Sequence, residues 1–319
     1  MKRIIISLFV TMGLIWPALA DEQGGYAILL KSSTSPYWMT MAQGFKDAAE
    51  QMGIPYQMHI SDAKTTPDAQ LQTCLSALEK KPEVLMVAAI NETNLLPCLR
   101  AASEQKIQIV DIDNSLDHKE AEGKGVKLAF SIGSNNVAAG EQAADYLAQA
   151  IMPMESGDIL IVQRPNGRAV DIQRIHGFRS KMGGLLPKMR LLQMTAPTDS
   201  PHGAANVLGH AIAKYPNIVA VFATEDRLAL AASEAAKSHG KNIVTIGIGG
   251  EKEARNSVFE SKLSATVAQL PYLIGKQSVE VAHDLQQGAT PPPVIYAPTL
   301  LINDDVLNKK NNHLLRYVK

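Results

Sequence analysis

The sequence predicts an α/β protein of two lobes, each a parallel sheet covered by helices on both faces. Short apolar, β-branched runs alternate along the chain with longer stretches that carry apolar residues at helical spacing. These runs are too many for one sheet in a chain of this length. A hydrophobic fraction of 46% with only 5% aromatic residues fits an aliphatic core of this kind.

The predicted elements follow from this alternation. Strands are expected at residues 26–30, 84–88, 107–112, 128–132, 159–162, 218–222, 243–248 and 265–268. Helices are expected between them, at residues 36–52, 67–81, 93–104, 135–151, 201–215 and 271–287. Several of these helices have proline or a polar cap at their first turn, as helix starts prefer.

The first twenty residues have the pattern of a cleavable secretory signal. Lys2 and Arg3 precede an apolar run at residues 4–15, and Ala18-Leu19-Ala20 stands directly before Asp21. The apolar run is too short to span a bilayer comfortably. We therefore expect cleavage after Ala20 and a mature chain that meets its ligand outside the cytoplasm.

Charge and motif content exclude several function classes. The chain has 31 basic and 31 acidic residues, and removal of Lys2 and Arg3 leaves 29 basic residues with no basic block, so nucleic acid is not an expected partner. The sequence has no His pair at metal-ligand spacing on a predicted helix, no Gly-x-Ser-x-Gly turn and no phosphate-binding glycine loop. We expect no enzymatic activity, no metal and no cofactor.

Cys74 and Cys98 are the two cysteines of the chain. They fall on neighbouring predicted helices, and an exported chain meets an oxidising compartment, so we expect a disulfide. A loop of this size would contribute roughly 3 kcal/mol to stability. Two buried free thiols are the alternative.

Ligands of open α/β lobes bind beyond the carboxyl ends of the strands, and the loops there carry suitable side chains. Tyr37 and Trp38 follow the first strand, where aromatic faces can stack on the C–H face of a sugar. Alternatively, one ring packs under the first helix. Asp113 ends a strand and can accept hydrogen bonds from two adjacent hydroxyls, although it could instead cap a helix or form a turn.

Strand-end loops elsewhere in the chain add further candidate ligand contacts. The Arg174 guanidinium suits a hydroxyl pair or a carboxylate. Glu225 and Gln269 each end a predicted strand and can reach the same crevice. Lys31 and Asn91 lie in two more of these loops.

Five motifs occur in a characteristic order along the chain: Ser-Pro-Tyr-Trp at 35–38, Val-Asp-Ile-Asp at 110–113, Ile-Gly-Ser-Asn-Asn at 132–136, Phe-Ala-Thr-Glu-Asp at 222–226 and Ala-Thr-Val-Ala-Gln-Leu-Pro at 265–271. With these motifs the chain resembles the periplasmic sugar-binding proteins of the ribose-binding type. The resemblance covers nearly all of the chain beyond residue 20.

The resemblance implies a type I periplasmic binding protein with two Rossmann-like lobes and a three-strand hinge. The first lobe would hold residues 21–133 plus 270–297, and the second 134–269 plus 298–319. Such a protein, expected to be monomeric, closes on a small polar ligand, here a monosaccharide, a polyol or an amine-bearing sugar derivative, and delivers it to an inner-membrane ABC permease. A periplasmic sensor subunit that signals to a chemoreceptor or histidine kinase is the alternative.

The resemblance also implies roles for particular residues. Tyr37 and Trp38 match the family's ring-stacking pair, and Asp113 matches its hydroxyl-binding acid. Arg174 and Gln269 match its arginine and its hinge glutamine.

Elsewhere the chain departs from the family pattern. Ser35 stands where an asparagine is usual, Asn114 where an arginine is, Asp199 where an aromatic residue is, and Glu225 where an asparagine is. Gly249 takes the position of the usual second aspartate. Fewer cations, more acids and the room left beside Gly249 predict a ligand that is larger than a free pentose or bears an amino group.

Overall fold

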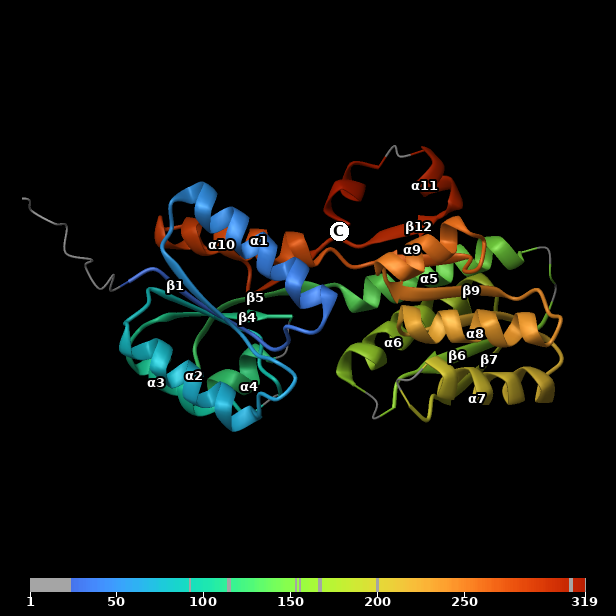
Figure 1. The fold of residues 1–319 in the computed structure, drawn as a ribbon, viewed down its shortest axis with the longest axis horizontal. Helices are drawn as coiled ribbons and strands as arrows, with labels where there is room; N and C mark the ends of the chain where they lie inside the picture. The colour runs from blue at the N-terminus through green and yellow to red at the C-terminus, as the bar shows by residue number, and fades with distance from the viewer. Residues whose placement is uncertain are drawn as a thin grey trace, which may run out of the picture.

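The structure is a computed structural model that describes residues 24–309 and 312–318, apart from residues 92, 114–115, 153, 155, 166–167 and 199–200 and the side chains of 201–203. The expected signal segment lies outside the described residues. The chain forms two α/β lobes side by side, each built on one six-stranded sheet (Figure 1).

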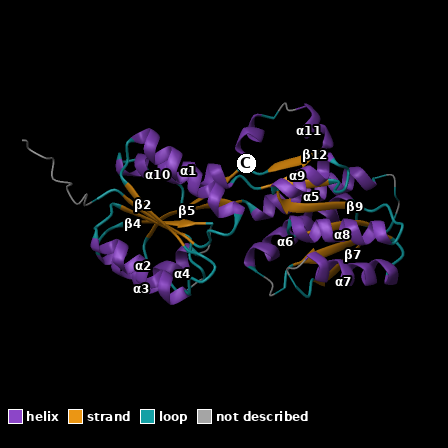
Figure 2. Cartoon of the chain, in the orientation of Figure 1, coloured by secondary structure: helices purple, strands orange, loops and turns teal. Residues whose placement is uncertain are grey.

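The first lobe contains a wholly parallel sheet in the order β11-β5-β4-β3-β1-β2. Its strands are β1 (Tyr26–Leu30), β2 (Tyr56–Ile60), β3 (Val84–Val87), β4 (Gln108–Ile112), β5 (Leu128–Ser134) and β11 (Val294–Ala297). Helices α1 (Pro36–Met52) and α10 (Pro271–Gln286) cover one face, and α2 (Pro67–Glu79), α3 (Leu96–Glu104) and α4 (His118–Gly123) cover the other (Figure 2). Successive residues of β1 show this division, because Ile28 packs under α1 while Leu29 packs with α2 and α3.

The second lobe has the strand order β12-β10-β9-β8-β6-β7, parallel except where β12 runs antiparallel to β10. Its strands are β6 (Asp158–Gln163), β7 (Arg190–Thr195), β8 (Ile218–Ala223), β9 (Val244–Gly249), β10 (Ala265–Ala268) and β12 (Leu300–Asn303). Helices α5 (Asn136–Ile151) and α6 (Ala169–Leu185) cover one face, and α7 (Pro201–Lys214), α8 (Asp226–Ser238) and α9 (Lys252–Phe259) the other, while α11 (Asp304–Lys309) follows β12.

The chain crosses between the two sheets three times, after β5, after β10 and between β11 and β12. The predicted fold, two parallel-sheet lobes joined by three connecting segments, is confirmed. Strands β2 and β7 were not predicted, and β11 and β12 take the place of the single hinge strand that the resemblance implies near residues 296–300. All four lie at sheet edges, and β2 and β7 lack a continuous apolar run because one side of each strand is solvated.

The predicted disulfide is confirmed. Cys74 on α2 and Cys98 on α3 are bonded, with their Cα atoms 6.1 Å apart, and both are fully buried. The bond joins two helices that cover the same face of the first sheet.

The C-terminal segment returns from the second lobe toward the first. Helix η1 (His313–Tyr317) lies between the lobes in Figure 1, and the Tyr317 ring stacks on Tyr272 of α10 with a centroid separation of 5.9 Å. Leu314 and Leu315 pack against the buried cluster formed by Ala268, Leu300 and Ile302. No helix among the residues described here has the length and apolarity needed to cross a bilayer.

Helices α5 and α6 meet backbone to backbone through two glycines. A Cβ atom at Gly177 would lie 2.0 Å from the Val137 carbonyl oxygen, and one at Gly140 would lie 2.0 Å from the Arg174 carbonyl oxygen. This approach places Arg174 against the start of α5, where the two lobes join.

We therefore expect Gly177→Ala to lower the free energy of unfolding by about 2 kcal/mol or more, because α6 must move away from α5. Urea denaturation measures the change. Gly184→Ala on the same helix is the matched control, since a Cβ there meets nothing within 4 Å. It should leave stability unchanged or raise it by up to about 1 kcal/mol. Equal losses in the two variants would contradict the close-packing argument.

Candidate functional site

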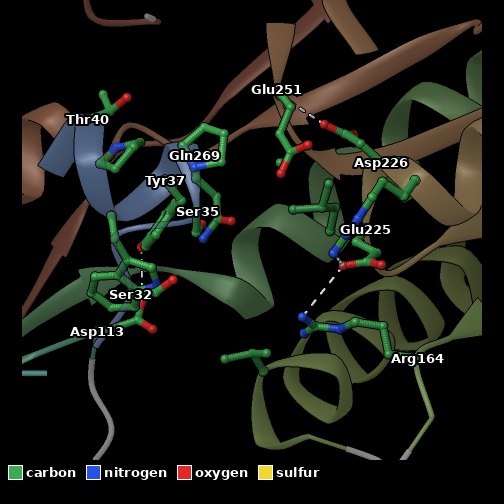
Figure 3. A pocket seen from close by; sticks show the side chains of 18 of the residues that line it. Ser32, Ser35, Tyr37, Thr40, Asp113, Arg164, Glu225, Asp226, Glu251 and Gln269 are labelled. Atoms are coloured by element: carbon green, nitrogen blue, oxygen red, sulfur yellow. Dashed lines mark hydrogen bonds and ion pairs between the residues drawn. The ribbon is translucent and has the colours of Figure 1, made fainter. Parts of the chain in front are cut away.

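A cleft of about 1310 Å³ opens between the lobes (Figure 3). Its walls come from the loops that follow β1, β3 and β4 in the first lobe and β6, β8, β9 and β10 in the second. These are the carboxyl ends of parallel strands, where α/β folds place their ligand sites.

Asp113 forms the polar centre of the first-lobe wall. Its backbone has a φ of 75°, and its N–H donates to the Ile132 carbonyl. The carboxylate accepts a 2.9 Å hydrogen bond from the Tyr37 hydroxyl through Oδ1, and the Lys31 ammonium lies 3.6 Å from Oδ2. The side chain is thus held in one orientation while it lines the cleft.

Tyr37 and Trp38 form the aromatic part of this wall. Their rings meet edge to face at 5.1 Å, and the Lys31 ammonium lies 4.8 Å from the centre of the Trp38 ring. Trp38 is only 6% exposed and belongs to the core under α1, yet it also lines the cleft. Burial, and then the charge of Asp113, raise the Tyr37 pKa well above its usual value, so this hydroxyl remains a hydrogen-bond donor.

Arg174 is buried where the lobes join, and its guanidinium connects three segments of the second lobe. Nε donates to Asn136 Oδ1 at 2.9 Å, Nη1 to the Thr224 carbonyl at 2.5 Å and Nη2 to Gln269 Oε1 at 3.0 Å. Gln269 in turn donates through Nε2 to the Ser134 hydroxyl at 2.8 Å. Burial, with the nearby Arg164 charge acting in the same direction, lowers the Arg174 pKa.

The second-lobe wall carries a row of ion pairs. Arg164 donates through Nε and Nη2 to the buried Asp171 carboxylate at 3.0 to 3.2 Å. Its Nη1 lies 3.6 Å from Glu225 Oε2, and Arg227 Nη2 lies 3.6 Å from the same oxygen. Glu225 therefore presents a carboxylate to the cleft beside two guanidinium groups (Figure 3).

Asp226 lies beneath the turn that follows β9. Oδ1 accepts a 2.6 Å hydrogen bond from the Thr266 hydroxyl, and Oδ2 accepts a 3.0 Å bond from the Glu251 backbone N–H. A Cβ atom at Gly249 would lie 2.7 Å from Asp226 Oδ2. The room expected beside Gly249 is therefore filled by this carboxylate.

The cleft combines an aromatic surface with hydrogen-bonding groups on two facing walls. Such a surface suits a polyhydroxylated ligand, whose hydroxyls bind carboxylates and amides while its C–H face packs on a ring. Within the described part of the chain, no group of three His, Cys, Asp or Glu side chains could hold a metal ion.

Comparison with known proteins agrees with this geometry. Residues 26–290 match the model of the periplasmic binding protein domain. The chain belongs to the periplasmic binding protein family. Its resemblance to the ribose-binding type is confirmed by relatives that match nearly end to end.

Two curated relatives and two solved structures illustrate the likeness. The D-allose-binding periplasmic protein of Escherichia coli is 25% identical over 93% of this chain and 95% of its own length. The ribose import binding protein RbsB of Bacillus subtilis is 29% identical over 89% of this chain and 90% of its own length. A solute-binding protein of Actinobacillus succinogenes with bound D-allose superposes with a TM-score of 0.78 at 24% identity, over 90% of this chain and 100% of its own. The structure of a periplasmic ribose ABC transporter from Conexibacter woesei superposes with a TM-score of 0.84 at 17% identity, over 94% of this chain and 99% of its own.

These relatives are binding proteins, in agreement with the expectation that the chain is not an enzyme. In this periplasmic binding protein, most of the predicted ligand contacts lie together. The cleft is lined by Lys31, Ser35, Tyr37, Trp38, Asn91, Asp113, Arg174, Glu225 and Gln269. Asn114 and Asp199, the other two predicted contacts, lie outside the described residues.

Two predicted residues have structural roles that the sequence did not reveal. The Asn91 side chain accepts hydrogen bonds from the backbone N–H groups of Thr93 and Asn94, so it shapes its own turn. All three side-chain nitrogens of Arg174 donate to protein acceptors, so it organises the cleft in addition to lining it.

Sequence reasoning missed Arg164, Asp226, Arg227 and Glu251 as individual cleft residues. Arg164 directly follows β6. The position of Arg164 at the end of a strand was a signal for a cleft residue, but the resemblance favoured Arg174 instead. Arg227 gave no such signal, because it lies inside the first turn of α8.

The Asp226 carboxylate predicts a particular pH dependence of stability. Burial raises its pKa from 3.8 to about 6, against the hydrogen bonds from Thr266 and Glu251, which lower it. Between these two values the folded chain binds more protons than the unfolded chain, so the free energy of unfolding falls as pH rises from about 4 to about 6. We expect this contribution to be about 2 kcal/mol.

Urea denaturation of the wild type and of Asp226→Asn at pH 4.5 and pH 7 tests this prediction. Other carboxylates titrate in both proteins, so the informative quantity is the difference between the two pH responses. The variant should lose less stability, or gain more, than the wild type on going to pH 7. Identical responses would show that Asp226 titrates normally in the folded chain.

Proposed function

We propose that this chain is the periplasmic substrate-binding protein of an ABC importer and that it captures a monosaccharide or polyol between its lobes as a monomer. The observation that carries this proposal is the Asp113 carboxylate. It is held by Tyr37 and Lys31 beside the Trp38 ring and faces the polar wall of the second lobe across the cleft.

Each wall of the cleft makes different contacts with the ligand. Asp113 accepts hydrogen bonds from adjacent hydroxyls, and the Tyr37 and Trp38 rings offer an apolar surface for the C–H face of a sugar. Glu225 and Gln269 supply further polar atoms from the opposite side. Ribose and allose binding by the relatives supports a sugar as the ligand class.

Lobe closure gives this arrangement its function. The cleft, about 1310 Å³, is larger than the typical volume of a small-molecule pocket, roughly 300–1,000 Å³. A ligand that bonds to both walls binds the closed state better and shifts the population toward it. We propose that an inner-membrane permease then recognises the closed form.

The proposal includes cleavage of the signal segment and the boundaries of the two lobes. Residues 1–20 act as a secretory signal, with cleavage after Ala20. Residues 21–133 plus 270–297 form one lobe and 134–269 plus 298–319 the other, which agrees with the strand order of the two sheets.

Calorimetric titration with D-ribose, D-allose, other neutral pentoses and hexoses, and polyols tests the proposed site. The full chain is expressed, and the protein is purified from the periplasmic extract. We expect at least one sugar to bind, and Asp113→Asn to weaken its binding by about 10- to 100-fold, because a hydrogen bond to a charged group contributes roughly 1.5–3 kcal/mol.

The matched control is Asp145→Asn, which alters a surface carboxylate of α5 paired with Lys181 outside the cleft. It should bind the sugar as the wild type does. Full binding by Asp113→Asn would remove the site assignment, and a panel without any binding sugar would contradict the proposed function.

A further inference from the structure

Four charged side chains of the second-lobe wall form a row in which the sign alternates. Asp171 binds Arg164 through two oxygens, Arg164 faces Glu225, and Glu225 faces Arg227. With two acids and two arginines, the formal charges of the row cancel. In these contacts Asp171 and Arg227 are the two ends of the row.

The two ends of this row differ in exposure. The side chain of Asp171 is fully buried, those of Arg164 and Glu225 are 12% exposed, and that of Arg227 is 49% exposed. Without Arg227, Glu225 would have to share the single charge of Arg164 with Asp171, which already binds Nε and Nη2 of that guanidinium. Charge interactions are poorly screened in this partly desolvated wall. Arg227 thus supplies a second positive charge beside Glu225, on the solvent side of the row.

Glu225 is the acid of the row that a ligand would meet, because it lines the cleft while Asp171 is fully buried. A ligand hydroxyl can donate to this carboxylate without bringing a charge. A ligand ammonium would have to approach two guanidinium groups that already balance Glu225, and it would be repelled by both. Asp113 on the opposite wall is balanced in the same way by Lys31.

We propose that Arg227 is a specificity-determining residue: by balancing Glu225, it makes the cleft select neutral sugars and reject their amine-bearing analogues. The inference rests on the proposed sugar-binding function. It reverses the preference for an amine-bearing ligand that the sequence predicts from its fewer cations and additional acids. Arg227 acts through Glu225, and its own contact with the ligand is not required.

The test compares each neutral sugar that binds with its 2-amino-2-deoxy analogue, by calorimetric titration at pH 7 and low ionic strength. The wild type should prefer the neutral sugar. Arg227→Gln should shift the ratio of the two dissociation constants toward the amino sugar by about fivefold or more, since one partly exposed charge pair corresponds to roughly 1 kcal/mol.

Three further variants isolate the charge effect. Arg227→Lys keeps the positive charge and should keep the wild-type ratio. The double variant Glu225→Gln and Arg227→Gln removes both charges and should abolish the shift. Arg179→Gln, on an exposed arginine of α6 next to Gln193, removes a positive charge away from the cleft and should leave the ratio unchanged.

The outcomes separate this inference from the function on which it rests. Binding of a neutral sugar with an unchanged ratio in Arg227→Gln would overturn the inference and leave the proposed function standing. An equal shift in Arg179→Gln would also overturn it, because a long-range effect of net charge would then be sufficient. Failure of every sugar to bind the wild type would contradict the proposed function and this inference together.

Discussion

The buried Arg174 guanidinium is the interaction on which the cleft depends. It connects the first residue of α5, the carbonyl after β8 and the glutamine after β10, and Gln269 extends the network to the last residue of β5. A buried charge is stable only where its donors are matched, and a buried donor left without its acceptor typically costs about 1–3 kcal/mol, or more for a charged group. The ends of several strands are therefore fixed relative to one another where the lobes join, and the glycine contact between α5 and α6 makes this position of Arg174 possible.

Charged groups are also paired in the two walls of the cleft. Asp113 and Glu225 both face the cleft, and each has a cation within 3.6 Å. Burial raises the pKa of Asp226, which is tied instead to a hydroxyl and a backbone N–H. The site thus offers oriented oxygen acceptors without a large field of either sign, as recognition of a neutral hydroxylated ligand requires.

Much of the fold could be predicted from the sequence, because strands buried on both faces, such as β1 and β3, read as unbroken apolar runs. The edge strands could not, since β2 and β7 have half-exposed, mixed sequences whose strand character comes from pairing with a neighbour. At the site, strand-end position predicted Asp113 and Glu225 as ligand contacts, and both line the cleft. The Arg227–Glu225 ion pair could not be predicted, because it depends on side-chain orientation. The contact between Gly249 and Asp226 could not be predicted either, because it joins two different elements.

Small-angle X-ray scattering of the protein, with and without a saturating sugar, tests most directly the central claim that a ligand is captured between two closing lobes. The account predicts that the radius of gyration falls when a sugar identified by titration is added, and that a sugar which does not bind leaves it unchanged. An unchanged radius of gyration at full occupancy would mean that the ligand binds without closure, and would contradict the account.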